Sequence, residues 1–167
     1  MRGFSLAHLL IIIGTIATAV VLFFVIYKPL DKFYIANDEK RTSDLKAIQS
    51  AVEKYYADFR KYPPNPGDCK KNIDMCRLTR LDASIANWGE GFNPYLEKLP
   101  KDPEGDNYAY YVSSDRQSYY IYASLDIDKQ NMCNDTRVCQ SIINNGLNPK
   151  MCKNICNYAV TSGNVTP

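Results

Sequence analysis

The chain has 167 residues, and its 20 lysines and arginines nearly balance its 18 aspartates and glutamates, for a formal net charge of +2. This balance excludes a strongly basic protein, so neither DNA nor a surface ligand gains support as a partner. The single histidine, His8, lies in an apolar segment, which leaves no imidazole for Ser-His or Cys-His catalysis elsewhere, and no GxxxxGK[ST] phosphate loop occurs. Composition therefore predicts a protein that is not an enzyme.

An apolar segment runs from Leu6 to Tyr27, and His8 is its one basic side chain. As a helix it has a length of roughly 33 Å at about 1.5 Å per residue, enough to cross a hydrocarbon core of about 30 Å. About 140 residues follow, the size of one domain with its own core. The sequence predicts a membrane anchor followed by one extracytoplasmic domain.

The next segment has the pattern of an amphipathic helix. Apolar residues recur there at intervals of three and four, which places them on one helical face: Leu45, Ile48, Val52, Tyr55 and Phe59. The opposite face is predicted to carry Asp44, Lys46, Glu53 and Lys54. We expect this helix to end near Tyr62, ahead of a proline-rich stop, and we expect Pro29 to bend or loosen the chain where its apolar and polar parts meet.

Further along, residues 77–85 are predicted to form a short helix, with Leu78, Leu81 and Ile85 on one face. Residues 107–112 and 118–125 are rich in Tyr, Val and Ile, and residues 113–117 between them have turn composition. This pattern predicts an antiparallel hairpin. Its tyrosines either close a small sheet over a helix or bind sugars or bases, and packing is the favoured interpretation.

All six cysteines lie beyond the apolar segment: Cys69, Cys76, Cys133, Cys139, Cys152 and Cys156. An even number in an exported chain predicts disulfides, with Cys69 and Cys76 as a local pair and the last four paired among themselves in an order that the sequence leaves open. The alternative for the last four is a zinc site, although their spacing differs from that of the usual zinc knuckle.

Oxygen donors concentrate in the segment that begins with Asp126 and Asp128 and continues with Asn131, Asn134 and Asp135. Alternation directs Asp126 and Asp128 to the same side, and calcium takes six to eight such oxygen ligands. Two interpretations stay open, a calcium site that includes Asp126 and Asp128 or a solvated acidic loop.

The sequence Gly3-Phe4-Ser5-Leu6, followed by the apolar segment, resembles the processing site of type IV pilins and type II secretion pseudopilins. The resemblance implies cleavage between Gly3 and Phe4 by a prepilin peptidase and methylation of the new amine of Phe4. It divides the chain into a leader (1–3), a transmembrane and assembly helix (4–28) and an extracytoplasmic globular domain (29–167). The family usually carries Glu where this chain has His8. His8 either accepts a hydrogen bond from the Phe4 amine of a neighbouring subunit or lies at the membrane interface.

Residues 95–103, with their Tyr-Leu, Leu-Pro and Asp-Pro pairs ahead of the hairpin, also resemble major pseudopilins, which bind calcium in the loop after their sheet. The implied fold is α+β and pilin-like, with a long N-terminal helix packed on a small antiparallel sheet and a disulfide-bonded C-terminal segment. The implied function is that of a filament subunit, of either a type IV pilus or a type II secretion pseudopilus. Its implied partners are copies of itself, the peptidase, an assembly platform and membrane lipid. Alternatives are a minor pilin that primes or tips a filament and an anchored binding module that does not polymerise. The protein is expected in the cytoplasmic membrane first and in a filament afterwards.

Overall fold

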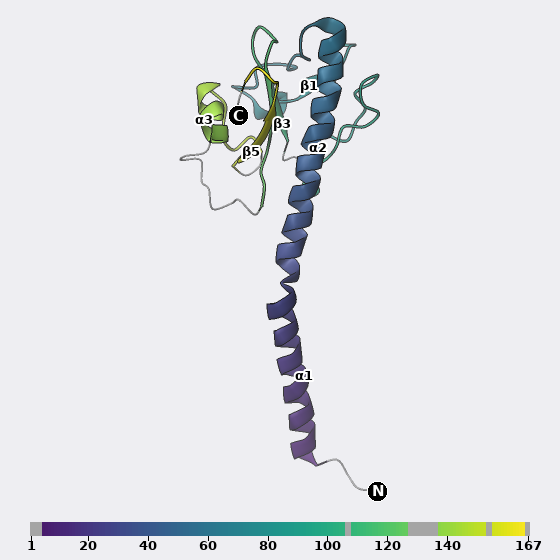
Figure 1. Ribbon diagram of the computed structural model, residues 1–167, viewed down its shortest axis with the longest axis vertical. Helices are drawn as coiled ribbons and strands as arrows, with labels where there is room; N and C mark the ends of the chain where they lie inside the picture. Colours follow the sequence, from purple (N-terminus) through teal and green to yellow (C-terminus); the bar gives the residue numbers. More distant parts are fainter. Residues whose placement is uncertain (1–4, 106–107, 127–136, 153–154, 166–167) are drawn as a thin grey trace. The chain divides into compact units, whose positions relative to one another are not determined.

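The structure is a computed structural model that describes residues 5–105, 108–126, 137–152 and 155–165 (Figure 1). The chain divides into two compact units, Met1–Ala36 and Asn37–Pro167. The first unit holds helix α1 (Leu6–Tyr27) and the start of helix α2 (Pro29–Phe59). The second unit holds the rest of α2, the described strands and helix α3, so the α+β class that the sequence predicts is confirmed.

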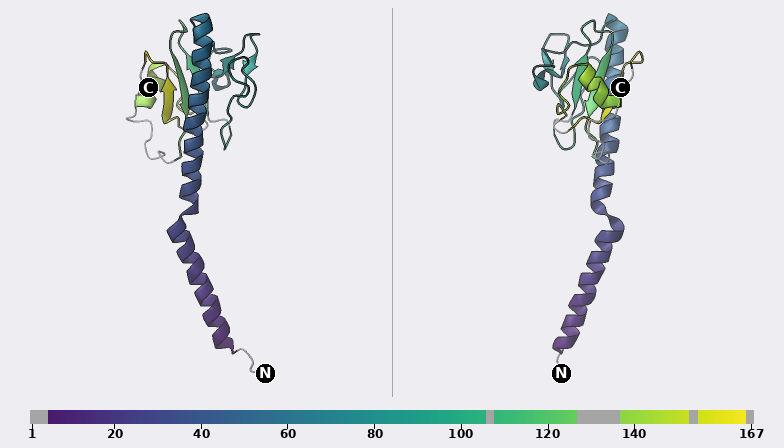
Figure 2. Two further views of the ribbon diagram at one scale, coloured as in Figure 1. Left: turned by 45° about the vertical axis from the view of Figure 1, so that its right-hand side comes forward. Right: turned by 90° about the vertical axis from the view of Figure 1, so that its left-hand side faces the viewer.

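Helices α1 and α2 are separated by one residue, Lys28, whose φ of 37° is left-handed. A residue that precedes proline is disfavoured in the right-handed helical region, and Pro29 has no backbone N–H to donate. The Lys28 N–H still bonds the carbonyl oxygen of Phe24 at 3.2 Å, so it caps α1 as the helix ends. The predicted interruption at Pro29 is therefore present as a break at Lys28 (Figure 2).

The second unit is built on a sheet in the order β3-β4-β5, formed by Ala109–Val112, Tyr119–Ala123 and Tyr158–Thr161. All its pairs are antiparallel, and Ile121 of β4 lies opposite Tyr110 of β3 and Val160 of β5. The predicted hairpin is confirmed. Helix α2 covers one face of the sheet, and helix α3 (Arg137–Asn144) covers the other (Figure 1).

The main core lies between α2 and the sheet. The α2 stripe supplies Leu45, Ile48, Val52 and Tyr55. The facing side of the hairpin supplies Tyr110, Tyr119 and Ile121, together with Tyr108 just before β3. Side chains alternate across a strand, so Tyr122 falls on the other face, in a second core with Ile142 of α3. The side chains of Tyr108, Tyr110, Tyr119 and Tyr122 are 0% exposed. Their role is packing, and the sugar- or base-binding interpretation is wrong for them.

Two carboxylates of α2 reach into this core. The hydroxyl of Tyr108 donates to Asp44 at 2.8 Å, and the hydroxyl of Tyr119 donates to Glu53 at 2.8 Å. A buried phenol needs an acceptor, and these carboxylates provide one. The sequence places Asp44 on the face opposite the stripe, and this is wrong because Asp44 is buried against Tyr108; Glu53 is half-buried.

The short helix predicted over residues 77–85 is also wrong. A two-stranded hairpin is present there, with β1 (Leu78–Thr79) paired to β2 (Ile85–Ala86). Ala83, in the connecting turn, has a φ of 66°, which a right-handed helix does not allow. In the described chain one helical element lies between α2 and β1, the 3-10 turn η1 (Ile73–Met75).

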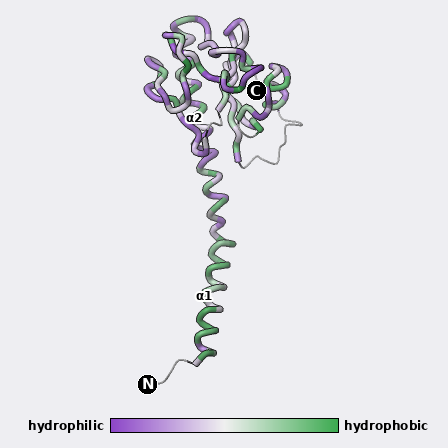
Figure 3. The backbone as a smooth tube through the Cα atoms, turned by 180° about the vertical axis from the view of Figure 1, so that it is seen from behind, coloured by the Kyte–Doolittle hydropathy of each residue, from purple (hydrophilic) through white to green (hydrophobic). Residues whose placement is uncertain are grey.

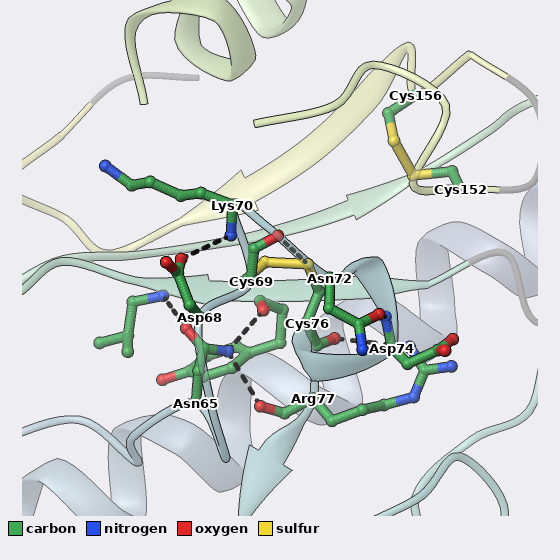
Figure 4. Close-up of a disulfide and its surroundings, with 12 residues drawn as sticks. Asn65, Asp68, Cys69, Lys70, Asn72, Asp74, Cys76, Arg77, Cys152 and Cys156 are labelled. Carbon is green, nitrogen blue, oxygen red and sulfur yellow. Dashed lines mark hydrogen bonds between the residues drawn. A yellow bond between two sulfur atoms is a disulfide. The ribbon is translucent and has the colours of Figure 1, made fainter. Parts of the chain in front are cut away.

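Strand β3 lies at the edge of its sheet, and the side chain of Asn65 covers that edge (Figure 4). Its Nδ2 donates to the carbonyl oxygens of Arg77 at 3.0 Å and Tyr110 at 2.8 Å. Its Oδ1 accepts the N–H of Val112 at 3.1 Å. One amide thus satisfies backbone groups that an open edge exposes.

Replacing this amide should destabilise the fold. Asn65→Ala leaves two carbonyl groups and one N–H without their partner, so we expect the free energy of unfolding to fall by about 2 kcal/mol or more. Urea denaturation of the full chain in detergent micelles measures this change. Asn144→Ala, at the exposed end of α3, is the control and should change it by about 0.5 kcal/mol or less. Equal losses in the two variants contradict the role given to Asn65.

The buried tyrosines predict a loss of stability at alkaline pH. Burial and the hydrogen bond to Asp58 raise the pKa of Tyr95 to about 12, and burial and Asp44 raise the pKa of Tyr108 further. A tyrosine in the unfolded chain has a pKa of about 10, so above pH 10 the unfolded state binds fewer protons than the folded state. The contribution of these tyrosines to the free energy of unfolding should be constant below pH 10 and should fall as the pH rises towards 12.

Urea denaturation at a series of pH values measures this, with tyrosinate absorbance as a parallel record. Tyr108→Phe should show a smaller decrease between pH 10 and 12. A free energy of unfolding that does not change over that interval contradicts the assignment of these phenols as buried neutral groups.

Candidate functional site: the apolar helix and a buried arginine

Helix α1 exposes apolar side chains on all its faces. None of its 22 residues is buried, and Leu6, Ile26 and Val25 are 75%, 72% and 63% exposed. Figure 3 shows the hydrophobic colour along the whole of α1. By length and composition it is the one helix in the described chain that is apolar enough to cross a membrane. A surface of this kind requires a cover of lipid or protein.

His8 lies in the first turns of α1. Its Nδ1 is 2.7 Å from Oγ of Ser5, the residue that precedes the helix, and the tautomer decides which atom donates. The residues of the predicted processing site, Gly3 and Phe4, lie outside the described residues. Cleavage, methylation and the role of His8 towards a neighbouring amine therefore stay predictions.

The second feature of the site is a buried arginine that the sequence analysis does not predict. Arg41 of α2 lies among four carboxylates, with 1% of its side chain exposed. Its Nε lies 2.7 Å from Asp102, its Nη1 lies 2.8 Å from Asp38 and 2.7 Å from Asp126, and its Nη2 lies 3.2 Å from Glu104. The planar guanidinium offers five N–H groups, so it can bond several carboxylates at once.

The partners of Arg41 come from three parts of the second unit. Asp38 precedes it by one helical turn on α2, Asp102 and Glu104 lie in the segment before β3, and Asp126 follows β4. Burial by itself lowers the pKa of an arginine, but the hydrogen bonds to Asp102, Asp126 and Asp38 outweigh it and raise the pKa of Arg41 well above its ordinary value. The guanidinium is always charged.

Backbone groups complete the cluster. The N–H of Asp126 donates to Asp38 at 2.8 Å, and the N–H of Glu104 donates to Asp102 at 2.8 Å. The amide of Asn37 donates to Glu104 at 3.3 Å. Asp38 and Asp102 thus bind the guanidinium and also accept from backbone N–H groups of the segments that contain Asp126 and Glu104.

The predicted calcium site falls partly outside the described residues. Asp128 lies there, together with Asn131, Asn134 and Asp135. Asp126 is described, and its Oδ2 already accepts from Arg41. Within the described chain no group of three or more His, Cys, Asp or Glu residues is arranged to hold a metal ion. Calcium binding by Asp126 and Asp128 stays a prediction.

The cysteines form disulfides on the α3 side of the sheet. Cys69 is joined to Cys76, as their spacing predicts, and Cys152 is joined to Cys156 (Figure 4). Cys139 is also disulfide-bonded, and Cys133 lies outside the described residues. The Cys152–Cys156 disulfide removes two of the four thiolates that the zinc alternative requires, so that alternative is wrong.

The sequence carries one signal for the arginine cluster. Asp38 and Arg41 continue the α2 stripe at the same three- and four-residue spacing that leads to Leu45 and Ile48. Charged residues at buried positions of a stripe indicate a paired buried charge. The partners Asp102, Glu104 and Asp126 are distant in sequence, and nothing in their own segments indicates that they meet Arg41.

The sequence of the chain is similar to that of known proteins. The family model described as type II secretion system (T2SS), protein G matches residues 30–141. The type II secretion system core protein G of Vibrio cholerae serotype O1 is 23% identical over 120 residues, which cover 72% of this chain and 77% of that protein. The protein with the same description from Escherichia coli K12 is 25% identical over 123 residues, which cover 74% of this chain and 80% of that protein. No solved structure matches the chain significantly. The match over residues 30–141 includes α2, the β3–β4 hairpin and part of α3, and it shows that the chain belongs to the type II secretion system protein G family.

Proposed function

We propose that this chain is a structural subunit of a type II secretion pseudopilus, a filament in which copies pack through α1 after residues 1–3 are removed. The observation that carries the proposal is the 22-residue α1 without a buried side chain, on a chain that belongs to the protein G family. Burying one Leu, Ile or Phe side chain of such a helix contributes roughly 1.5–3 kcal/mol. Lipid provides this cover before assembly, and other copies of α1 provide it in the filament.

The proposed life of the protein has two stages. In the first, α1 anchors it in the cytoplasmic membrane, with the second unit and its disulfides on the oxidising side. In the second, a prepilin peptidase cuts between Gly3 and Phe4, and an assembly platform adds the subunit to the filament by apolar packing without a covalent link. No catalytic role is proposed. The family match favours a pseudopilus over a type IV pilus.

A second candidate function rests on His8. A minor subunit that primes or tips the filament does not have to satisfy the same contact at every step of assembly, so it tolerates a departure from the usual Glu. Abundance separates the two candidates, because a main subunit greatly outnumbers a priming subunit. Quantitative mass spectrometry of membranes and sheared filaments measures that ratio.

The proposed function predicts that the N-terminus of the chain is cleaved. Co-expression with a prepilin peptidase should shift the mass of the chain by the loss of Met1-Arg2-Gly3 and the addition of one methyl group, as intact-protein mass spectrometry can measure. Gly3→Leu should block the shift. Gly14→Leu is the matched control and should be processed normally, because a Cβ at Gly14 meets nothing within 4 Å. An unprocessed wild-type chain contradicts assembly through a trimmed α1 and favours an anchored module that does not polymerise.

The proposed function also predicts how substitution of His8 changes filament assembly. If its side chain faces the Phe4 amine of a neighbouring subunit, His8→Glu supplies a carboxylate that pairs with this amine, and assembly should be maintained or increased. Thr18→Glu, deeper in the same apolar helix, is the control and should reduce assembly, because an unpaired carboxylate is costly in an apolar environment. The pelleted fraction of sheared filaments gives the measurement. A similar loss of filaments in both variants contradicts the position proposed for His8.

A further inference from the structure

The Arg41 cluster lies where two connections of the second unit reach the sheet. Asp102 and Glu104 lie ahead of β3, and Asp126 comes directly after β4. The start of β3 and the end of β4 lie at the same end of the hairpin because the two strands are antiparallel. Arg41 therefore fastens both connections to α2 at one place, which we call the Arg41 joint (Asp38, Arg41, Asp102, Glu104 and Asp126).

The chemistry of the Arg41 joint is that of a cation held by carboxylate oxygens. Calcium is bound by such oxygens at about 2.3–2.6 Å. In this chain Oδ2 of Asp126 lies 2.7 Å from Nη1 of Arg41, and Oδ2 of Asp102 lies 2.7 Å from Nε. A divalent cation that used Asp126 here would have to displace the guanidinium or share the carboxylate with it against charge repulsion. Oδ2 of Asp126 and Oδ2 of Asp102 are thus already bonded to Arg41, and within the described chain no group of three or more His, Cys, Asp or Glu residues is arranged to hold a metal ion.

We propose that Arg41 is the internal cation of this joint, and that its guanidinium holds Asp126 and the segment of Asp102 and Glu104 against α2 without a bound metal ion. A guanidinium suits this task because its N–H groups lie in one plane and point in different directions. A lysine has a point charge and three donors, so it bonds fewer of the four carboxylates. A methionine of similar length has no charge and leaves the carboxylates facing one another.

Three backbone amides report on the joint directly. The N–H of Glu104 bonds the side chain of Asp102, the N–H of Gly105 bonds the carbonyl oxygen of Asp102, and the N–H of Asp126 bonds Asp38. The hydrogen exchange rates of these amides measure local opening of the joint. A free energy of global unfolding cannot do this, because it sums the contributions of the whole second unit. Neither filament assembly nor processing enters this measurement, so its outcome is independent of the proposed function.

The experiment follows the exchange of these amides in the full chain in detergent micelles, with calcium chloride and with EGTA. In the wild type, EGTA should leave their exchange rates unchanged. Arg41→Met should raise them about tenfold or more in both conditions, because removing one partner leaves buried carboxylates without their cation. Arg41→Lys should give an intermediate increase. Arg80→Met, which removes the Arg80–Glu90 ion pair elsewhere in the second unit, is the control and should leave these three amides unchanged.

Two results overturn the proposal. Exchange in the wild type that rises about tenfold when calcium is chelated assigns the cation of the joint to a metal ion. Equal exchange in the wild type and Arg41→Met shows that the guanidinium does not hold the joint. The amides of β3 and β4 serve as the check that Arg41→Met is folded, and the wild-type comparison with EGTA needs no variant at all.

Discussion

The structure of this protein depends on one constraint: the apolar side chains of α1 are exposed and must be covered by another molecule. Helix α1 exposes Leu, Ile, Val and Phe around its full circumference, and water is a poor solvent for such a surface. Some other material has to cover it. Under the proposed function this material is first lipid and then other copies of the same helix, so the same surface accounts for both the anchor and the filament.

Helix α2 meets a different requirement. From Asn37 onward it covers the sheet, and it uses three kinds of contact along its length. Arg41 binds carboxylates from two connections, Leu45 to Tyr55 pack on the tyrosines of the hairpin, and Asp44 and Glu53 accept bonds from tyrosine hydroxyls. The buried hydroxyl groups of these tyrosines thus find hydrogen-bond acceptors in carboxylates of the helix. The disulfides act on the opposite face of the sheet, in the smaller core around Tyr122 and Ile142.

Local patterns in the sequence were sufficient for the elements that rest on local signals. The α2 stripe, the hairpin at 109–112 and 119–123 and the Cys69–Cys76 pair follow from periodicity, turn composition and short spacing. The failures occur where distant contacts decide. Strands β1 and β2 have two residues each, too few for a period, and β5 is a strand because β4 offers it an edge. Helix α3 is not predicted because its eight residues span only about two helical turns, too few for a clear period, although its apolar residues reach the second core. Arg41 was missed because its acceptors are more than 60 residues away, apart from Asp38.

The central claim is that α1 joins copies of this chain into a filament. Electron microscopy of filaments sheared from cells that produce the chain with its secretion system, together with mass spectrometry of their subunit, tests it most directly. The account predicts thin filaments composed mainly of this chain, with Phe4 as the first residue of each subunit. Cells that make the processed protein in quantity, but in which it remains as single copies in the membrane and contributes to no filament, would contradict it.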